Sequence, residues 1–461
     1  MSEPEIAIVG SGPSGFFAAE ALLKAGIGAR VDMFDRLPTP YGLVRSGVAP
    51  DHQQIKQVVK VFDNLANNPQ FSFFGNIDVG SDISLGSLRS RYDAVILAYG
   101  ASAGTSLSIP GSRLAQSITA TDFVGWYNGH PDFANFNPCF DHECAVVVGH
   151  GNVAIDVARI LLSDHARLAK TDMADHAIEA LRHSRVRRVH LVGRRGAIQA
   201  SFTTAELREL LGLSDVRVVI EPDVLQLDEE ERGFLELPVN AAIKRNFSVI
   251  SDAASRGLDR EATRELHLNF LASPVAIEGT DRVEAVHFVR NRLEGPVASR
   301  KAVPSGERFS ISAGLTIASI GFQGRPLGDV PFDDRRGIIP NVEGRVTGDS
   351  FGGSSLYVAG WIKRGATGII GTNRADAAET VRTLLADFRD KRWSVKTDRP
   401  QALTPLGNPR INFADWKRID EAECRSGQEA GRPRRKLVSV DAMLDIVRSG
   451  EAPAMPSQPA A

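Results

Sequence analysis

The chain has 461 residues, too many for one ordinary hydrophobic core, so two or three domains are expected. Its net charge of −2 argues against a nucleic-acid binder driven by overall charge, although it leaves room for a local basic patch. Its 42 glycines matter because glycine lets the backbone approach a ligand closely.

Cysteine content and the N-terminus indicate the compartment. Three cysteines, Cys139, Cys144 and Cys424, cannot build a disulfide framework or hold a four-thiolate iron–sulfur cluster. The opening MSEPEIAIVG runs almost directly into an apolar strand and lacks the basic region and cleavage site of a signal peptide. Apolar runs stay far below the roughly 20 residues that span a bilayer. We therefore expect a cytoplasmic protein.

The first predicted elements form a compact strand–turn–helix–strand unit. They are a strand over residues 6–9, a glycine turn over 10–15, a helix to about residue 25 and a strand over 31–34. Gly10 permits the tight turn, Gly12 lets the backbone approach a pyrophosphate, and Gly15 lets the helix pack closely on the strand. Pro13 and Ser14 belong to the same turn, where helix N–H groups face phosphates.

Asp35 ends the second strand, twenty residues after the last glycine of the turn, and can accept hydrogen bonds from ribose hydroxyls. A lone glycine pattern is weak evidence, and a merely structural turn is the alternative. The strand, helix, second strand and correctly spaced acid together predict a dinucleotide site.

The next segment, PTPYGLVRSGVAPDH at residues 38–52, is predicted to be a rigid irregular loop. Its three prolines and two glycines are too much turn chemistry for a helix or an interior strand. Further on, YDAVILAYGA at 92–101 predicts a buried strand that ends in a turn of small residues. There we expect the chain to leave the first domain.

A second dinucleotide unit begins at CAVVVGHGNVAIDVARILL. A strand over 145–148 meets Gly149-x-Gly151-x-x-Ala154, and a helix follows through 155–162. A later strand is followed by Arg194 and Arg195. Arginines pair with a 2′-phosphate, whereas an acid at this place favours NAD. The unit therefore predicts an NADPH site, with a solvated basic strand end as the alternative.

Two different dinucleotide sites in one chain suggest a flavoprotein that binds FAD at the acid-ended unit and NADPH at the arginine-ended unit. TIASIGFQG at 316–324 is expected to be the return to the first domain. We predict an α/β fold of two Rossmann-like domains, with the NADP domain inserted into a discontinuous FAD domain. The predicted boundaries are 1–104 and 325–449 for the FAD domain, 105–324 for the NADPH domain and 450–461 for a disordered, Pro- and Ala-rich tail.

Several motifs occur in the order found in the adrenodoxin reductase-like ferredoxin–NADP⁺ reductases, and the chain resembles this family from Gly10 to Asn373. The motifs are GSGPSG, PTPYGLVRSGVAPDH, GHGNVAIDVARILL, VGRRG followed by FTTAELREL, and GWIKRGATGIIGTN. A weaker similarity around Trp416 and GRPRRKL extends nearly to the C-terminus. The resemblance implies hydride transfer from NADPH to FAD, then single-electron transfers to an iron–sulfur ferredoxin. With no ferredoxin module in the chain, we expect a separate acceptor protein and a monomeric reductase.

The resemblance also implies roles for individual residues. In the family, the loop like 38–52 lies along the FAD, with Leu43 as a contact and His52 near the flavin. A proton role for His52 competes with a role that only fixes the loop. Glu209 matches a carboxylate near the same centre, where it would orient nicotinamide or tune the potential; a plain surface glutamate is the alternative.

Further cofactor contacts follow from the same resemblance. Those to FAD are Val79, Trp361, Gly368, Ile369 and Ile370, with Gly368 also near the nicotinamide. Those to NADPH are His150, Gly151, Asn152, Val153, Arg194, Arg195 and Glu206. Three positions depart from the family: Asp35 replaces a commoner glutamate, Tyr41 stands where tryptophan is also seen, and His150 stands where asparagine or glutamine is usual.

Four rivals share parts of this pattern. A flavin disulfide reductase needs two cysteines that reach each other and the flavin, but Cys139 and Cys144 are spaced C-x₄-C rather than C-x-x-C. A glutamate synthase small subunit needs an N-terminal cysteine-rich domain, but the first cysteine of this sequence is Cys139. The others are another NADPH-dependent flavin reductase and a non-enzymatic flavin sensor, against which the paired sites argue.

The expected partner is an acidic, two-iron ferredoxin, which a basic surface would attract. Candidate basic residues in the NADPH domain are Arg182, Arg185, Arg187, Arg188, Lys244 and Arg245. The alternative for each of them is a solvated surface charge.

Overall fold

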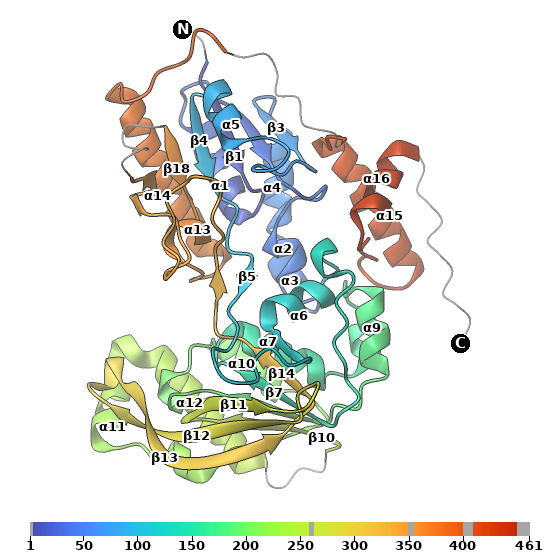
Figure 1. The fold of residues 1–461 in the computed structure, drawn as a ribbon, viewed down its shortest axis with the longest axis vertical. Coiled ribbons are helices and arrows are strands. Elements are labelled where there is room, and N and C mark those ends of the chain that lie inside the picture. Colours follow the sequence, from blue (N-terminus) through green and yellow to red (C-terminus); the bar gives the residue numbers. More distant parts are fainter. Residues whose placement is uncertain (1–2, 258–261, 349–354, 400–408, 450–461) are drawn as a thin grey trace. The chain divides into compact units, whose positions relative to one another are not determined.

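The computed structural model describes residues 3–257, 262–348, 355–399 and 409–449 (Figure 1). The predicted tail at 450–461 lies outside the described residues. The chain divides into two compact units. Unit 1 comprises Met1–Ala103, Asn128–Ala134 and Phe322–Ala461, and unit 2 comprises Gly104–Tyr127 and Asn135–Gly321. The predicted fold class, two Rossmann-like units with the second inserted into the first, is confirmed.

Unit 1 is built on a seven-stranded sheet of order β16-β17-β18-β4-β1-β2-β3. Its strands are β1 (Glu5–Val9), β2 (Arg30–Phe34), β3 (Phe71–Phe74), β4 (Ala94–Leu97), β16 (Asn341–Val342), β17 (Arg345–Val346) and β18 (Leu356–Val358). The five strands from β18 to β3 are parallel, and β16 and β17 add an antiparallel edge. The strand order reverses at β1, and ligands of open α/β sheets bind beyond the carboxyl ends of the strands at such a point.

Both faces of this sheet are buried, as is usual for parallel sheets. Because successive side chains of a strand point to opposite faces, they join two different apolar clusters. Along β1, Ile6 and Ile8 join one apolar cluster, whereas Ala7 and Val9 join the other. The first cluster also takes in residues of α1, α4, α14 and α15, and the second takes in residues of α5. The helices of unit 1 are α1 (Pro13–Lys24), α2 (Leu43–Ser46), α3 (Gln53–Lys56), α4 (Val59–Ala66), α5 (Leu85–Arg91), α13 (Trp361–Arg364), α14 (Ile370–Arg389), α15 (Phe413–Glu429) and α16 (Val440–Ser449).

Unit 2 is built on a six-stranded sheet of order β6-β14-β7-β8-β10-β9, in which every pair is parallel. Its strands are β6 (Ser117–Thr119), β7 (Cys144–Val148), β8 (Arg188–Val192), β9 (Val216–Val219), β10 (Arg264–Asn269) and β14 (Leu315–Ala318). The helices are α6 (Ala120–Tyr127), α7 (Asn152–Leu162), α8 (His165–Leu168), α9 (Asp175–Arg182), α10 (Thr204–Leu211), α11 (Glu229–Glu236) and α12 (Ala241–Gly257).

An antiparallel sheet of β11 (Ala272–Glu278), β12 (Ala285–Glu294) and β13 (Lys301–Ser312) packs against the parallel sheet of unit 2. Val146 and Val148 of β7 share one apolar cluster with Val286 and Phe288 of β12. Remaining elements are the short strands β5 (Ala103–Gly104) and β15 (Phe322–Gln323), which pair, and the 3₁₀ turns η1 (Pro131–Phe133), η2 (Ala197–Gln199), η3 (Pro222–Leu225), η4 (Pro238–Asn240) and η5 (Val297–Ser299).

Two details of the fold bear on function. Residues 128–134 cluster with unit 1, although the sequence places them inside the inserted segment 105–324. Arg36 makes a two-point ion pair with Asp132, and Lys436 donates to Asn128 Oδ1 at 3.0 Å, so this short excursion is tied to unit 1. Among the described residues, no helix is long and apolar enough to cross a membrane.

Candidate active site

The first glycine turn follows β1 and opens α1, as the sequence predicts. Gly10 has φ +106°, and a Cβ there would lie 2.6 Å from Ala98 O. A Cβ at Gly15 would lie 2.1 Å from Gly10 O, so only glycine fits both places. At Gly12, the N-cap of α1, an added Cβ would meet nothing within 4 Å. Protein atoms therefore pack closely against Gly10 and Gly15, whereas space is left beside Gly12, the residue expected to face a pyrophosphate.

Asp35 follows β2 and accepts hydrogen bonds from Ser11 of the glycine turn. Its Oδ2 accepts from Ser11 N at 2.9 Å and from Ser11 Oγ at 2.6 Å, and its Oδ1 accepts from Leu37 N at 3.0 Å. A carboxylate offers about four lone-pair positions, so capacity for a ribose hydroxyl is left. The sequence predicted the ribose contact and missed the contacts to Ser11.

The loop at 38–52 packs directly on this turn. Tyr41 N donates to Ser11 O at 2.9 Å, and a Cβ at Gly42 would lie 3.0 Å from Gly12 Cα. Leu43 begins α2, and this large apolar side chain is 38% exposed. His52 is half-buried and is the N-cap residue of α3.

The segment GWIKRGATGIIGTN meets the same turn from the C-terminal part of unit 1. A Cβ at Gly360 would lie 2.2 Å from Ser14 Oγ, and Ser14 Oγ donates to Asn373 Oδ1 at 3.1 Å. Gly360 also has φ +77°, so this close approach needs glycine. The segment is thereby held against the first turn of α1.

Side chains of this segment fit an aromatic ligand. Trp361, which begins α13, has a buried Nε1 with no hydrogen-bond partner among the described residues. Ile369, just before α14, is 67% exposed, and Gly368 before it has φ +82°. An unsatisfied buried donor and exposed large apolar side chains, Leu43 and Ile369, are what a site for a flavin dinucleotide would leave. The residues present fit FAD. Val79, by contrast, is 6% exposed within the apolar cluster of α5.

The second glycine turn follows β7 and opens α7. Gly149 has φ +137°, and a Cβ there would lie 2.1 Å from Ser319 O. At Gly151, the N-cap of α7, the nearest atom to an added Cβ is Ser201 Oγ at 3.7 Å. Asn152 accepts from Thr203 N at 2.8 Å, which joins the turn to the start of α10; Val153 follows it in the first turn of α7.

His150 points inward, which its place in the motif did not reveal. Its Nε2 lies 3.2 Å from Leu191 O, and its ring packs edge-on to Phe270 with centroids 4.8 Å apart. A Cβ at Gly193 would lie 2.1 Å from His150 Nδ1. Burial lowers the pKa of His150 to about 4, so its imidazole is neutral near pH 7. A contact from this residue to NADPH would involve its backbone.

Arg194 and Arg195 lie beyond the carboxyl end of β8 with both side chains exposed. Their backbone is fixed: Arg194 O accepts from Asn291 Nδ2 at 2.9 Å, and Arg195 O accepts from Leu271 N at 3.1 Å. Two exposed guanidinium groups on a rigid backbone suit a phosphate that carries two negative charges.

Glu206 and Glu209 lie one turn apart on α10 and share a buried cation. Arg159 of α7, whose side chain is fully buried, has its Nη1 at 3.4 Å from Glu206 Oε2 and 3.7 Å from Glu209 Oε2. The same Nη1 lies 2.9 Å from Asp156 Oδ1. Sequence reasoning missed Arg159, and the only signal was its spacing from Asp156 on a helix that follows the glycine turn.

Comparisons with known proteins give relatives along almost the whole chain. Residues 4–251 match the family model described as pyridine nucleotide-disulphide oxidoreductase. The NADPH-ferredoxin reductase FprA of Mycobacterium tuberculosis is 46% identical over 458 residues, 96% of this chain and 98% of that protein. The mitochondrial NADPH:adrenodoxin oxidoreductase of Arabidopsis thaliana is 41% identical, over 95% of this chain and 94% of that protein. The solved structure of Mycobacterium tuberculosis FprA in complex with NADPH has a TM-score of 0.88 at 44% identity, covering 97% of this chain and 100% of that chain.

The chain belongs to the adrenodoxin reductase-like ferredoxin–NADP⁺ reductases.

In this ferredoxin–NADP⁺ reductase, the cysteines do not form a redox pair of the disulfide-reductase kind. Cys144 is the first residue of β7 and is buried, and burial raises the pKa of its thiol to about 11. A thiol that stays protonated is a poor nucleophile for disulfide exchange. Cys139 is a free, half-buried thiol.

Replacing Cys139 and Cys144 by serine is therefore expected to leave NADPH-dependent turnover within about twofold of the original rate. The measurement is steady-state reduction of a two-iron ferredoxin, with flavin content as the control for folding. A Cys144→Ala change gives a second comparison, because serine adds a buried hydroxyl. Loss of turnover in protein that still carries flavin would revive the disulfide-reductase alternative.

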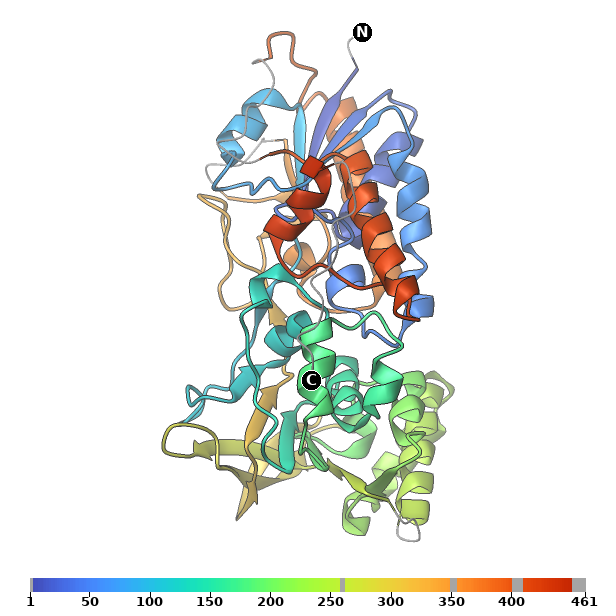
Figure 2. The same ribbon diagram turned by 90° about the vertical axis from the view of Figure 1, so that its right-hand side faces the viewer.

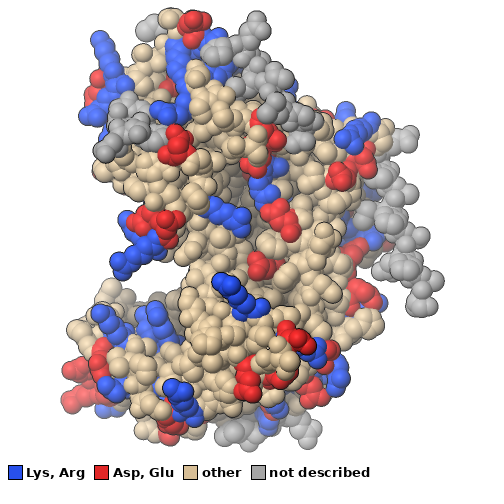
Figure 3. Space-filling model, in the orientation of Figure 1, with Lys and Arg blue, Asp and Glu red and all other residues tan. Residues whose placement is uncertain are grey.

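Four of the six basic residues proposed for docking lie within ion-pairing distance of a carboxylate. Arg182 pairs with Glu179 at 3.2 Å, Arg188 with Glu265 at 2.9 Å and Lys244 with Glu236 at 2.7 Å. Arg185 has Glu143 at 4.0 Å. On the visible face, basic and acidic side chains are interspersed in both units (Figure 3). Four of the five candidate arginines lie before β8 or at its first residue, at the end of this strand opposite to Arg194: Arg182, Arg185, Arg187 and Arg188.

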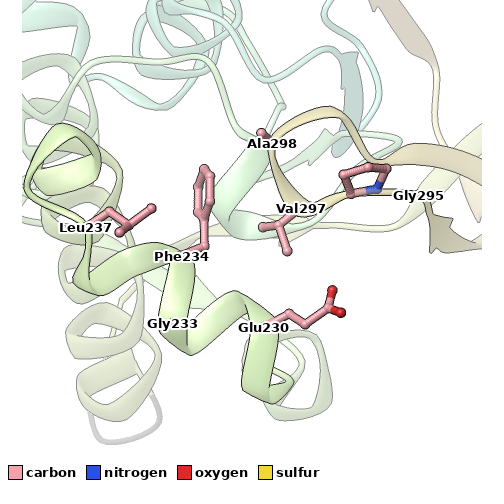
Figure 4. A pocket seen from close by; sticks show the side chains of 8 residues that line it. Glu230, Gly233, Phe234, Leu237, Gly295, Val297 and Ala298 are labelled. Carbon is pink, nitrogen blue, oxygen red and sulfur yellow. The ribbon is translucent and has the colours of Figure 1, made fainter.

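A shallow pocket of unit 2 lies between α11 and η5, where Phe234 and Val297 come close (Figure 4). Its lining residues are Glu230, Gly233, Phe234, Leu237, Gly295, Pro296, Val297 and Ala298. They include none of the predicted cofactor contacts.

Proposed function

We propose that this protein is an FAD-dependent NADPH–ferredoxin reductase. The observation that carries the proposal is the pairing, in one chain, of two dinucleotide turns with different strand ends. Asp35 follows the second strand of unit 1, and Arg194 and Arg195 follow the corresponding strand of unit 2. Similarity to NADPH-ferredoxin reductases over nearly the whole chain supports it.

The chain's own residues supply the FAD site. Gly12 and Ser14 carry backbone N–H groups at the start of α1, where Pro13, which has no N–H, fixes the backbone of the first turn. These N–H groups and the positive end of the helix favour the pyrophosphate. Asp35 would accept from the ribose. When bound, FAD takes a hydride from NADPH and releases electrons one at a time.

Leu43, Trp361 and Ile369 would exclude water from a bound flavin, and Trp361 Nε1, buried without a hydrogen-bond partner among the described residues, would donate to an acceptor of the cofactor. Gly368 and Ile370 lie at the start of α14, where helix N–H groups remain unpaired by the helix itself. Val79 is kept as a proposed contact of the same cofactor.

In unit 2, we assign the NADPH pyrophosphate to the turn Gly149 to Val153 and the 2′-phosphate to Arg194 and Arg195. Glu206 and Glu209 approach the cofactor from α10 with Arg159 between them. Arg159 lies within ion-pairing distance of both carboxylates and fixes their direction. We propose that Glu209 orients the nicotinamide, and that His52 holds the loop at the start of α3 and takes part in the hydrogen bonding of the site.

The test is anaerobic mixing of the yellow protein with NADPH and an oxidised two-iron ferredoxin while both absorption spectra are followed. Rapid bleaching of the flavin with NADPH, slow bleaching with NADH and subsequent reduction of the ferredoxin are expected. Bleaching without ferredoxin reduction would contradict the acceptor and leave the cofactors standing. No bleaching with either nucleotide would contradict the function.

We also propose that the ferredoxin is of the acidic two-iron type and that the reductase is a cytoplasmic monomer. Of the six basic candidates, Lys244 and Arg245 of α12 remain as the stronger pair, because the other four sit at the far edge of the sheet. Light scattering of the purified protein tests the monomer: the mass of two chains would contradict it.

Ferredoxin KM is expected to rise on the order of tenfold when salt is raised from about 50 to about 500 mM, because screening removes attraction between opposite charges. Arg245→Glu should raise the KM at low salt and flatten this dependence. Arg182→Glu, before the amino end of β8, is the matched control. It should change neither the ferredoxin KM at low salt nor the dependence of this KM on salt. A KM that does not change with salt would contradict the acidic partner.

A further inference from the structure

The helix α15, in the last part of unit 1, and the residues after it pack on the loop that carries the proposed FAD contacts. In Figures 1 and 2, α15 and α16 lie beside the early helices of unit 1, although more than 300 residues separate them in sequence. Trp416 of α15 is 1% exposed and belongs to the same apolar cluster as Tyr41 and Phe16. None of these contacts follows from the dinucleotide motifs.

The centre of this contact is a buried ion pair between Arg45 of the loop and Glu423 of α15. Arg45 donates to both carboxylate oxygens, at 2.8 and 2.5 Å, and the Glu423 side chain is fully buried while that of Arg45 is 10% exposed. The Arg45 guanidinium also lies over the Trp416 ring, 5.3 Å from its centroid. A bidentate pair fixes direction as well as distance.

Glu423 has no spare capacity for another role in the folded chain. Its oxygens also accept from Arg434 Nη1 at 2.9 Å and from Leu437 N at 2.8 Å. Burial opposes its ionisation, yet Arg45 and Arg434 hold its pKa below the usual value. Lys436 adds a second link, because its Nζ donates to Arg45 O at 3.0 Å.

A second anchor lies four residues earlier in the loop. Tyr41 has φ +85°, a left-handed backbone that is costly for a tyrosine, and its ring is 5% exposed. Its hydroxyl donates to Asp63 and accepts from Trp416 Nε1 at 3.2 Å. Because Tyr41 N donates to Ser11 O, the strained turn rests on the pyrophosphate-binding turn. Tyr41 and Arg45 thus hold the loop on either side of Leu43.

We propose that Glu423 is a positioning residue for the loop at 38–52: through its ion pair with Arg45, the helix α15 holds Tyr41 to Leu43 against the first glycine turn. This inference rests on the proposed function, because it takes that loop to be part of the FAD site. Glu423 touches no cofactor itself and acts through Arg45. Losing the carboxylate charge leaves Arg45, whose side chain is 10% exposed, without the anion that it shares with Arg434, whereas Arg434 keeps its ion pair with Asp420 at 2.7 Å.

The test compares three variants of the full-length protein purified with its flavin. Glu423→Gln keeps the shape and removes the charge. Glu421→Gln, on the same helix and exposed, is the control for charge. Ile419→Ala, also on α15 and fully buried, is the control for stability, because it loosens the packing of the helix without touching Arg45.

The rate of FAD release after dilution is measured by the recovery of flavin fluorescence. We expect this rate to be about tenfold higher in Glu423→Gln than in the original protein, and to change by less than about twofold in Glu421→Gln and Ile419→Ala. Trypsin should cleave after Arg45 in Glu423→Gln and spare that bond in both controls. Arg45→Lys, which keeps the charge but not the two-point geometry, should release FAD at least about threefold faster. This variant decides the matter should Glu423→Gln fail to fold.

Equal acceleration in Glu423→Gln and Ile419→Ala would overturn the proposal, since the ion pair would then act only through stability. Unchanged release in Glu423→Gln or Arg45→Lys would overturn it as well, while leaving the proposed function intact. An original protein that binds no FAD would overturn both.

Discussion

Replacing Arg194 and Arg195 together by alanine is expected to raise the KM for NADPH by at least about 100-fold and to leave the KM for NADH within about twofold. A hydrogen bond to a charged group contributes about 1.5–3 kcal/mol, so two guanidinium groups on one phosphate account for roughly this factor. The backbone of both residues is fixed by Asn291 and Leu271, so the side chains can be removed without disturbing the turn.

The measurement is steady-state ferredoxin reduction with each nucleotide. Arg185→Ala is the matched control, because Arg185 is exposed and lies before β8 rather than after it. Its KM for NADPH should not change. If the double variant loses NADPH and NADH turnover equally, the arginines support the fold and do not select the 2′-phosphate.

Gly12→Ala is expected to give a folded protein that no longer retains FAD. In the chain alone a Cβ at this position meets nothing within 4 Å, and φ is −74°, so alanine is tolerated by the protein. The added methyl group would instead occupy the place where a pyrophosphate approaches the backbone. We expect FAD affinity to fall at least about 100-fold, or roughly 2.7 kcal/mol.

Thermal unfolding of the FAD-free protein should stay within about 2 °C of the original, which separates a binding defect from a folding defect. Gly86→Ala is the control: this residue is in the first turn of α5, where an added Cβ lies 3.7 Å from Ser84 Oγ. Gly15→Ala, with its Cβ 2.1 Å from Gly10 O, should instead lower the unfolding temperature. Normal FAD retention in Gly12→Ala would place the pyrophosphate elsewhere.

The sequence predicts the parts of the fold whose signals are local. Each glycine turn joins a strand to a helix at fixed spacing, and Gly10 and Gly149 each adopt the positive φ that their place in the pattern requires. The strands β1 and β7 are short apolar runs buried on both faces, which typify parallel sheets. The sequence also predicts the domain insertion, because the second dinucleotide unit lies between two segments that belong to the first domain.

Contacts between residues far apart in the sequence could not be predicted from local sequence patterns. Arg45 and Glu423 are 378 positions apart, and nothing in either local sequence selects its partner. Arg159 sits in an ordinary helical pattern, so its place between Glu206 and Glu209 depends on how α7 and α10 pack. His150 occupies a motif position, yet its ring direction is set by the absence of a side chain at Gly193.

The seven residues 128–134 matter for attempts to exchange nucleotide preference by recombining relatives. If residues 104–321 were replaced as one block by those of a relative, positions 128 and 132 would come from the donor protein. Their partners in unit 1, Lys436 and Arg36, would still come from the recipient, so both contacts could be lost. The chain passes between units at four places rather than two. A chimera that retains the recipient's own 128–134 and draws only the flanking pieces from the donor respects these junctions.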